Sequence, residues 1–340
     1  MSYGYRHKQG GPFEGIGPMS RGLRLVVQIP CLNEEATLSD TVRGIPREIP
    51  GIASVEIQVI DDGSTDRTVE VARSLGVDHV VSHPRNKGLA ASFQSGIENA
   101  LALGADIVVN TDGDNQYNGA SIPDLVRPIV EGRADIVVGD RNPGGNAEFP
   151  LSKRLFQRLG SRTVRALAGL DISDAVSGFR AYSREAAMRI NVMTRFSYTV
   201  ETLIHAGQGG LTVVSVPVRV NGMTRPSRLF RSNVQFMRKQ AVTMLRSCVM
   251  YRPLSAFLVL GLTMLAIGAM PVARFLWLYA IGEGDGHVQS LVLGGVFLLA
   301  GYLTVVIAFL SDTIATNRRL LEATLLRLRR LEGDAPDGGR

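Results

Sequence analysis

The chain has 340 residues, of which 45% are hydrophobic, so a globular unit of catalytic size with a large core is expected. Its net charge of +6 is concentrated in particular stretches and only 6% of its residues are aromatic, which favours lipid headgroups or phosphorylated substrates over nucleic acid as partners. The two cysteines, Cys31 and Cys248, stand far apart and indicate neither a disulfide framework nor a zinc site, consistent with a reducing compartment.

Residues 1–22 are rich in glycine and polar side chains, have no apolar segment of the signal-peptide type, and are predicted to form a loose tail. From Leu23 onward, short β-branched runs alternate with stretches of helical periodicity. The predicted strands are Leu25–Pro30, Val55–Ile60, His79–Ser82, Ile107–Thr111, Asp135–Gly139 and Thr212–Val220, and the predicted helices are Glu35–Arg43, Asp66–Leu75, Gly88–Leu103 and Ile122–Glu131. This alternation predicts an α/β fold with a mostly parallel sheet and helices on both faces, in which ligands bind at the carboxyl ends of the strands.

Polar segments follow four consecutive predicted strands. The most informative is Asp112-Gly113-Asp114, because side chains two residues apart on a strand point to the same side and two converging carboxylates suit Mg²⁺ or Mn²⁺. Each segment on its own has an ordinary alternative, such as a polar turn or a helix cap. Their joint placement at four strand ends favours a nucleotide and metal site.

The segments Pro30-Cys31-Leu32-Asn33-Glu34-Glu35, Asp61-Asp62-Gly63-Ser64-Thr65-Asp66, Arg85-Asn86-Lys87-Gly88 and Asp112-Gly113-Asp114 resemble, in order and spacing, the nucleotide-sugar domain of family 2 glycosyltransferases, which have the GT-A fold. The resemblance implies a GT-A domain over residues 23–228. It also implies contacts of Pro30, Asn33, Glu34 and Asp62 with the nucleobase and ribose, with Asp61 as the alternative for the base contact. By the same resemblance, Lys87 lies near the diphosphate, and Asp112 and Asp114 hold the metal.

Two later segments, Val137-Val138-Gly139-Asp140-Arg141 and Ser177-Gly178-Phe179-Arg180-Ala181-Tyr182, resemble the acceptor half of glycosyltransferases that load sugars onto polyprenyl phosphate, the dolichyl-phosphate mannose synthase type. This resemblance implies that Arg141 and Arg154 hold the acceptor phosphate, a task that suits the planar donor fork of arginine. Arg158 stands where that group has a serine, and Ser161 is the nearest serine. A solvated helix face is the alternative for Arg154 and Arg158.

Three further charged residues have predicted roles. Arg225 and Arg228 resemble a basic loop that closes over the donor diphosphate. Glu201 could be a base, a donor-sugar contact or an acid favoured at a helix start. We expect a structural or sugar-contact role for Glu201, because a phosphate acceptor is already anionic and needs little deprotonation.

A basic segment follows the predicted catalytic domain. Between Arg219 and Arg252 the sequence contains eight basic residues and no acidic one. Apolar residues recur there at helical spacing, which predicts an amphipathic helix over residues 229–252 that lies in the headgroup layer of a membrane. A calmodulin-binding or nucleic-acid-binding helix would show the same pattern, but the apolar runs that follow favour the membrane.

Two uncharged runs, Leu254–Ala273 and Leu291–Leu310, are each about 20 residues long, the length needed to cross a bilayer. Residues 253–312 are therefore predicted to form a transmembrane hairpin. Arginines flank both outer ends, so the positive-inside rule places the catalytic domain and both termini in the cytoplasm. Residues 313–340 are predicted to form a basic helix and tail, whose leucines favour a homo-oligomer.

These features predict a metal-dependent, inverting glycosyltransferase of the cell membrane, which moves one sugar from a nucleotide-diphosphate sugar to undecaprenyl- or dolichyl-type phosphate in cell-envelope glycan synthesis. Mg²⁺ or Mn²⁺ on Asp112 and Asp114 would neutralise the leaving diphosphate, and Arg141 would position the attacking phosphate. One alternative keeps the fold and changes the acceptor to diacylglycerol, ceramide or a polysaccharide. The other is a non-catalytic membrane scaffold that binds nucleotide sugar.

Overall fold

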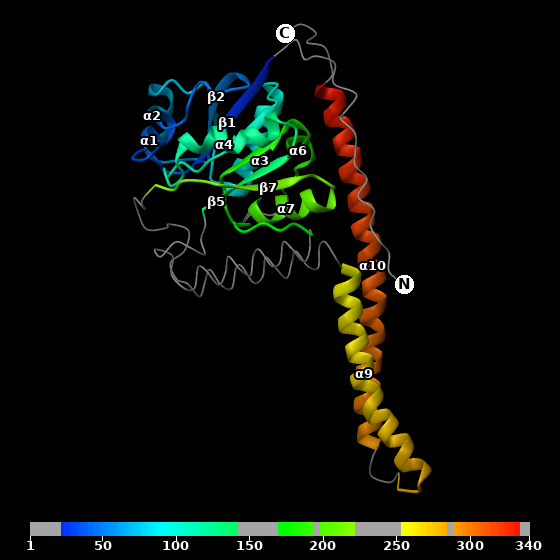
Figure 1. The fold of residues 1–340 in the computed structure, drawn as a ribbon. Coiled ribbons are helices and arrows are strands. Elements are labelled where there is room, and N and C mark those ends of the chain that lie inside the picture. Colours follow the sequence, from blue (N-terminus) through cyan, green and yellow to red (C-terminus); the bar gives the residue numbers. More distant parts are fainter. Residues whose placement is uncertain (1–21, 142–168, 193–197, 222–252, 284–287, 334–340) are drawn as a thin grey trace.

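The computed structural model describes residues 22–141, 169–192, 198–221, 253–283 and 288–333. An α/β domain comes first, and two long helices follow it (Figure 1). The strands are β1 (Leu23–Cys31), β2 (Ile52–Asp61), β3 (His79–Ser82), β4 (Ile107–Asn110), β5 (Ile136–Asp140), β6 (Arg180–Ser183) and β7 (Val213–Pro217). The helices are α1 (Leu38–Arg43), α2 (Thr68–Ser74), α3 (Leu89–Ala102), α4 (Ile122–Val130), α6 (Arg184–Arg189), α7 (Tyr198–Gln208), α9 (Pro253–Ala280) and α10 (Val288–Gly333), with a 3₁₀ turn, η1, at Gly119–Ser121.

The seven strands form one sheet in the order β3-β2-β1-β4-β6-β5-β7. All neighbouring strands are parallel except β6, which runs antiparallel to both β4 and β5. The predicted α/β fold with a mostly parallel sheet is confirmed. The sequence did not predict β6, because it has only four residues and begins with a charged one, Arg180.

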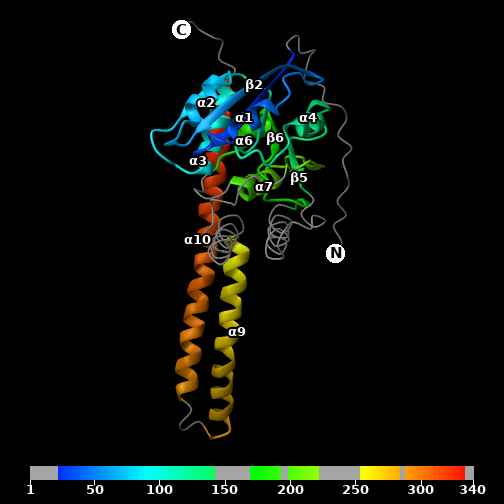
Figure 2. The same cartoon turned by 90° about the vertical axis from the view of Figure 1, so that its left-hand side faces the viewer.

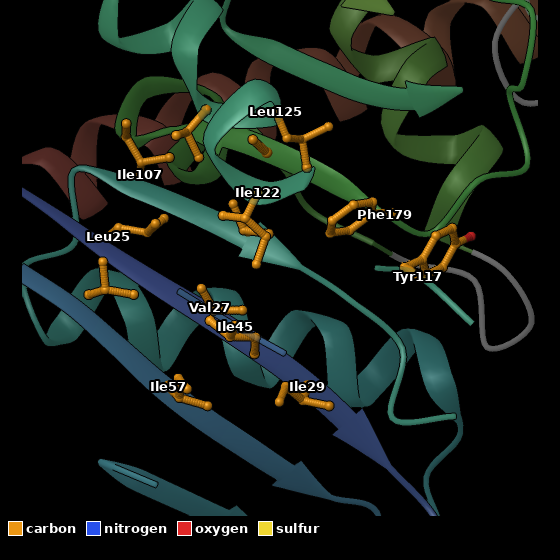
Figure 3. Close-up of a cluster of buried hydrophobic side chains, with 14 of the residues drawn as sticks. Leu25, Val27, Ile29, Ile45, Ile57, Ile107, Tyr117, Ile122, Leu125 and Phe179 are labelled. Carbon is orange, nitrogen blue, oxygen red and sulfur yellow. The ribbon is translucent and has the colours of Figure 1, made fainter. Parts of the chain in front are cut away.

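The domain core lies on both faces of this sheet. Along β1, Leu25, Val27 and Ile29 belong to one cluster of buried side chains (Figure 3). The helices α1, α2 and α4 contribute residues to this cluster. Val26 faces the opposite cluster, which is closed by α3, α6 and α7. Side chains alternate between the two faces of a strand, so a central strand that is covered on both sides is mostly apolar. Burying each of these aliphatic side chains contributes about 1.5–3 kcal/mol.

The helices α9 and α10 pack against each other and project from the α/β domain, as the two views in Figures 1 and 2 show. Glycines allow a close approach, since a Cβ atom added at Gly268 would lie 2.8 Å from the backbone nitrogen of Leu298. Large apolar side chains stay exposed on both helices, among them Trp277 at 68% and Val292 at 62%. Both helices are long and apolar enough to cross a membrane, and this exposure distinguishes them from core helices of a soluble domain.

The second apolar run and residues 313–333 of the predicted tail form one helix, where the sequence predicted two. α10 continues for 46 residues because neither glycine nor proline interrupts it between Gly301 and Gly333. Its later part contacts α6 of the α/β domain. The predicted tail (residues 1–21) and the predicted amphipathic helix (residues 229–252) lie outside the described residues.

Candidate functional site

The polar segments predicted from the sequence lie together at one edge of the sheet. The strands that precede them, β3, β2, β1 and β4, are neighbours in this order. Direct contacts join the segments, because the backbone nitrogen of Asp62 donates to the carbonyl of Cys31 at 2.9 Å and the Thr37 hydroxyl donates to the carbonyl of Gly113 at 2.8 Å. The structure therefore brings the predicted donor and metal residues of these four segments into one region.

The loop after β1 is fixed by its own polar residues. Asn33 has a positive φ of 58°, a conformation that asparagine tolerates better than most residues. Its backbone nitrogen donates to the Ser64 hydroxyl at 2.9 Å, and its side-chain oxygen accepts from the Thr65 nitrogen at 2.8 Å. The Glu34 nitrogen donates to the Thr68 hydroxyl at 2.8 Å. These bonds tie the loop that carries Glu34, directly after the strand that contains Pro30, to the loop after β2 and the start of α2.

The adjacent acids Asp61 and Asp62 have different surroundings. Both are buried, at 4% exposure, and the carboxylate of Asp62 accepts from the backbone nitrogens of Lys87 and Gly88 at 2.9 and 2.8 Å. It also bonds Nδ1 of His83 at 2.8 Å. The carboxylate of Asp61 accepts from the backbone nitrogen of Ser64 at 3.0 Å. Asp62 thus anchors the turn that presents Lys87, and this favours Asp61, the alternative of the sequence prediction, for the nucleobase.

The acidic pair lies just beyond β4. Burial raises the pKa of the Asp112 carboxyl to about 7, and the negative charge of Asp114 acts in the same direction. Glu34 adds to this effect and Arg141 opposes it. Crowded carboxylates whose charges repel each other suit a divalent cation, and oxygen ligands suit Mg²⁺ or Mn²⁺.

The number of side chains that could coordinate a metal ion here is small. Among the residues that the structure describes, no group of three or more histidine, cysteine or acidic side chains is arranged to hold a metal ion. A cation on Asp112 and Asp114 would therefore complete its coordination with phosphate oxygens of a substrate and with water, as Mg²⁺ commonly does. The residues present fit that arrangement.

Arg141 is a cation beside this pair. Its guanidinium donates two hydrogen bonds to Asp174, at 2.7 and 3.0 Å, and only 11% of its side chain is exposed. It also lies over the ring of Tyr117, 5.8 Å from the ring centre. Burial lowers the pKa of Arg141, but Tyr117, Asp174 and Asp112 together raise it above its ordinary value. Arg141 is therefore a fixed positive charge next to Asp112, and its contact with an acceptor stays a prediction.

Of the other residues with predicted roles, the structure describes only Glu201. Glu201 is buried in the first turn of α7, at 4% exposure. Arg154, Arg158, Ser161, Arg225 and Arg228 lie outside the described residues.

Sequence reasoning missed several buried polar residues that shape this region. Asp174, to which the sequence analysis gave no role, is the partner that orients Arg141. His83 bonds both Asp62 and the hydroxyl of Ser95. The fully buried Arg180 donates to the carbonyls of Ala175 and Ser177. No periodicity marks such residues, because their partners are far away in sequence or are backbone carbonyls.

Known proteins resemble this chain in both sequence and structure. A model of the family described as glycosyl transferase family 2 matches residues 26–190. A dolichyl-phosphate hexose transferase of Haloferax volcanii is 32% identical over 194 residues, which cover 57% of this chain and 81% of the relative. An undecaprenyl-phosphate mannosyltransferase of Micrococcus luteus is 26% identical over 206 residues, covering 58% and 83%.

The fold has a solved counterpart. The crystal structure of glucosyl-3-phosphoglycerate synthase from Mycobacterium tuberculosis with Mn²⁺, UDP-glucose and phosphoglyceric acid is 25% identical and superposes with a TM-score of 0.51. The match covers 67% of this chain and 80% of that structure, so the predicted GT-A fold is confirmed. With its strand-end acids, its mixed seven-stranded sheet and these relatives, the chain belongs to glycosyl transferase family 2.

Proposed function

We propose that this chain is a membrane-anchored glycosyltransferase that moves one sugar from a nucleoside diphosphate sugar to polyprenyl phosphate, with inversion at the anomeric carbon. The observation that carries the proposal is the adjacency of the acids Asp112 and Asp114 to the buried cation Arg141, in a domain joined to two exposed apolar helices. The names of the relatives from Haloferax volcanii and Micrococcus luteus support a polyprenyl-type acceptor.

The donor half of the site uses the ends of β1 and β2 and the loops that follow β1, β2 and β3. Asp61, Pro30 and Glu34 contact the nucleobase and ribose, while Asp62 and Asn33 hold the loops in place. Lys87 pairs with the diphosphate, and Arg225 and Arg228 add positive charge. Mg²⁺ or Mn²⁺ bound by Asp112 and Asp114 supplies the charge that makes the nucleoside diphosphate a good leaving group.

The acceptor half needs a fixed cation more than it needs a base. A phosphate monoester already carries an anionic nucleophile, so its placement governs the rate. Asp174 holds the Arg141 guanidinium in one orientation, which lets it position the phosphate oxygen on the side of the sugar opposite the leaving group. Arg154, Arg158 and Ser161 are further proposed contacts of the acceptor phosphate. Glu201 is buried in a helix start, which supports a structural role rather than that of a base.

The membrane half brings the site to its lipid substrate. Residues 253–312 form a hairpin across the cell membrane, and the amphipathic segment 229–252 lies in the headgroup layer. Arginines outside both spans favour a cytoplasmic catalytic domain with both termini on that side. The contact of α10 with α6 is consistent with this topology, because it puts the tail and the domain on the same side. A homo-oligomer is part of this proposal.

The deciding experiment is a transfer assay with purified full-length protein in detergent. It is incubated with Mg²⁺ or Mn²⁺, a panel of radiolabelled nucleotide sugars and a short polyprenyl phosphate, and the lipids are then extracted. We expect one sugar to enter the lipid fraction and chelator to abolish the transfer. Asp114→Asn serves as the control, with most activity lost and the fold retained. Transfer to diacylglycerol or ceramide in place of polyprenyl phosphate would replace the proposed acceptor, and no transfer with any donor would favour the scaffold alternative.

A further inference from the structure

A row of amide side chains crosses the centre of the sheet. Gln58 on β2, Gln28 on β1 and Asn110 on β4 stand side by side in the strand register, and each has 0% exposure. An amide in an apolar interior is costly unless its hydrogen bonds are satisfied. Three aligned amides on the face that otherwise carries apolar side chains therefore require an explanation.

The hydrogen bonds connect the row to α3 at one end and to Gly178 and Tyr198 at the other. At one end Gln58 Nε2 donates to the carbonyl of Gly96 on α3 at 2.7 Å. In the middle Gln28 Nε2 donates to Asn110 Oδ1 at 2.9 Å. Because its oxygen is used by Gln28, Asn110 must turn its nitrogen to the opposite side. There Nδ2 donates to the carbonyl of Gly178 at 3.0 Å and to the Tyr198 hydroxyl at 2.9 Å.

The peptide of Gly178 is held on both sides and lies against Asp112. Its nitrogen donates to the Tyr117 hydroxyl at 3.1 Å, and its carbonyl accepts from Asn110 and, at 3.4 Å, from the Tyr198 hydroxyl. A Cβ atom added at Gly178 would lie 3.3 Å from both carboxylate oxygens of Asp112. The Asp112 carboxylate and the Tyr198 hydroxyl, which is 2.9 Å from the same added Cβ atom, thus both lie next to the side of Gly178 that carries no side chain.

We propose that Asn110 is a positioning residue that sets the place of the Asp112 carboxylate through the peptide of Gly178. The Asn110 end of the amide row then supports the cation site, whereas the Gln58 end, which bonds α3, contributes to stability alone. This inference rests on the proposed function in one respect, namely that Asp112 binds the divalent cation. Partners behind a metal ligand commonly change metal affinity by about 10–100-fold when they are removed.

The test compares Asn110→Leu with Gln58→Met. Each replaces a fully buried amide of the same row by an apolar side chain of similar shape, but the bonds of Gln58 go to α3 and Gln28, away from Gly178. Mn²⁺ binding is measured by electron paramagnetic resonance on full-length protein with a nucleoside diphosphate and without acceptor. Melting temperature is recorded alongside. We expect both variants to melt lower, and only Asn110→Leu to weaken Mn²⁺ binding, by about tenfold or more.

Two further variants keep the inference testable if Asn110→Leu does not fold. Tyr198→Phe keeps the ring that stacks on Phe93 at 4.1 Å and removes only the hydroxyl, so a smaller loss of Mn²⁺ affinity is expected. Gly178→Ala places a methyl group 2.9 Å from the Tyr198 hydroxyl and 3.3 Å from both carboxylate oxygens of Asp112, and it should give the largest loss. Equal Mn²⁺ affinity in the wild type, Tyr198→Phe and Gly178→Ala would overturn the inference, as would equal losses in Asn110→Leu and Gln58→Met. A wild type without Mn²⁺ affinity would overturn the metal assignment of the proposed function and this inference with it.

Discussion

Asp61 and Asp62 are neighbours in the sequence, but their carboxylates have different hydrogen-bond partners. The sequence Asp61-Asp62 offers two equivalent carboxylates, and only the folded chain shows that Asp62 accepts two backbone nitrogens of the Lys87 turn. Asp61 has no such task in the bonds described above. The nucleotide role and the structural role are therefore expected to separate by mutation.

Asp62→Asn is expected to lower stability, whereas Asp61→Asn is not. An amide at position 62 cannot accept from Lys87, Gly88 and His83 as the carboxylate does, and one unsatisfied buried donor costs about 1–3 kcal/mol. At position 61 an amide oxygen can still accept from Ser64. Thermal unfolding and nucleotide binding by calorimetry check this, with weaker binding expected for Asp61→Asn. Unchanged nucleotide affinity in that variant would return the base contact to Asp62.

Arg141→Lys is expected to raise the KM for polyprenyl phosphate with little effect on the donor. Lysine keeps the charge, so Asp174 is not left buried without a cation, but the two-pronged donor is lost. A charge-assisted hydrogen bond of about 1.5–3 kcal/mol corresponds to about tenfold or more in KM. Glu201→Gln serves as the comparison and is expected to retain turnover. An inactive Glu201→Gln together with a normal Arg141→Lys would point to a neutral lipid acceptor.

At the scale of elements, the three strands at one side of the sheet are tied together by the hydrogen bonds of one carboxylate. Glu56 on β2 accepts from Arg24 on β1 at 2.7 Å and pairs with His79 on β3 at 2.8 Å. The hydrogen bond from Arg24 lowers the pKa of Glu56 below its ordinary value of 4.5, burial opposes this shift, and His79 adds to it. Since the folded state holds the ionised carboxylate, this stabilisation is present above about pH 4.5 and is lost as the pH falls through the lower folded pKa.

Glu56→Gln is therefore expected to destabilise the protein at pH 7 by about 1 kcal/mol or less, because the pair is partly exposed. Below pH 4 the difference between wild type and variant should shrink. Thermal unfolding in detergent across this pH range measures it. A difference that stays constant with pH would mean that Glu56 stabilises the sheet through its shape rather than its charge.

The elements themselves were largely predictable from the sequence, for physical reasons. β1, β2 and β4 are β-branched runs covered on both faces, and α3 and α4 carry clear apolar stripes. The sequence did not predict β6 because the strand begins with Arg180. The buried guanidinium of Arg180 is satisfied by backbone carbonyls, and no pattern of side chains in the sequence reveals such partners. For the same reason the strand ends could be predicted as a site, while the partners Asp174, His83 and Asn110 could not.

At the scale of the whole molecule, the topology of the hairpin can be tested directly. In a background with Cys31 and Cys248 replaced by alanine, cysteines are introduced at Glu283, between the two helices, and at Thr324, in the later part of α10. An impermeant thiol reagent added to intact cells is expected to label position 283 and not position 324. Labelling at 324 alone would invert the proposed orientation, and equal labelling at both positions would contradict the hairpin.

The length of the single helix α10 bears on the distance between the α/β domain and the membrane in the proposed topology. At about 1.5 Å per residue its 46 residues span about 69 Å, of which a bilayer core takes up about 30 Å. The remaining turns of α10 extend beyond the span and contact α6, the helix directly after β6. One residue inserted into this part of α10 would rotate the turns that follow it by about 100° about the helix axis and shift them by about 1.5 Å along it. In the proposed topology, the length of α10 therefore helps to set both the height and the orientation of the α/β domain, and with it the proposed acceptor site, relative to the membrane surface.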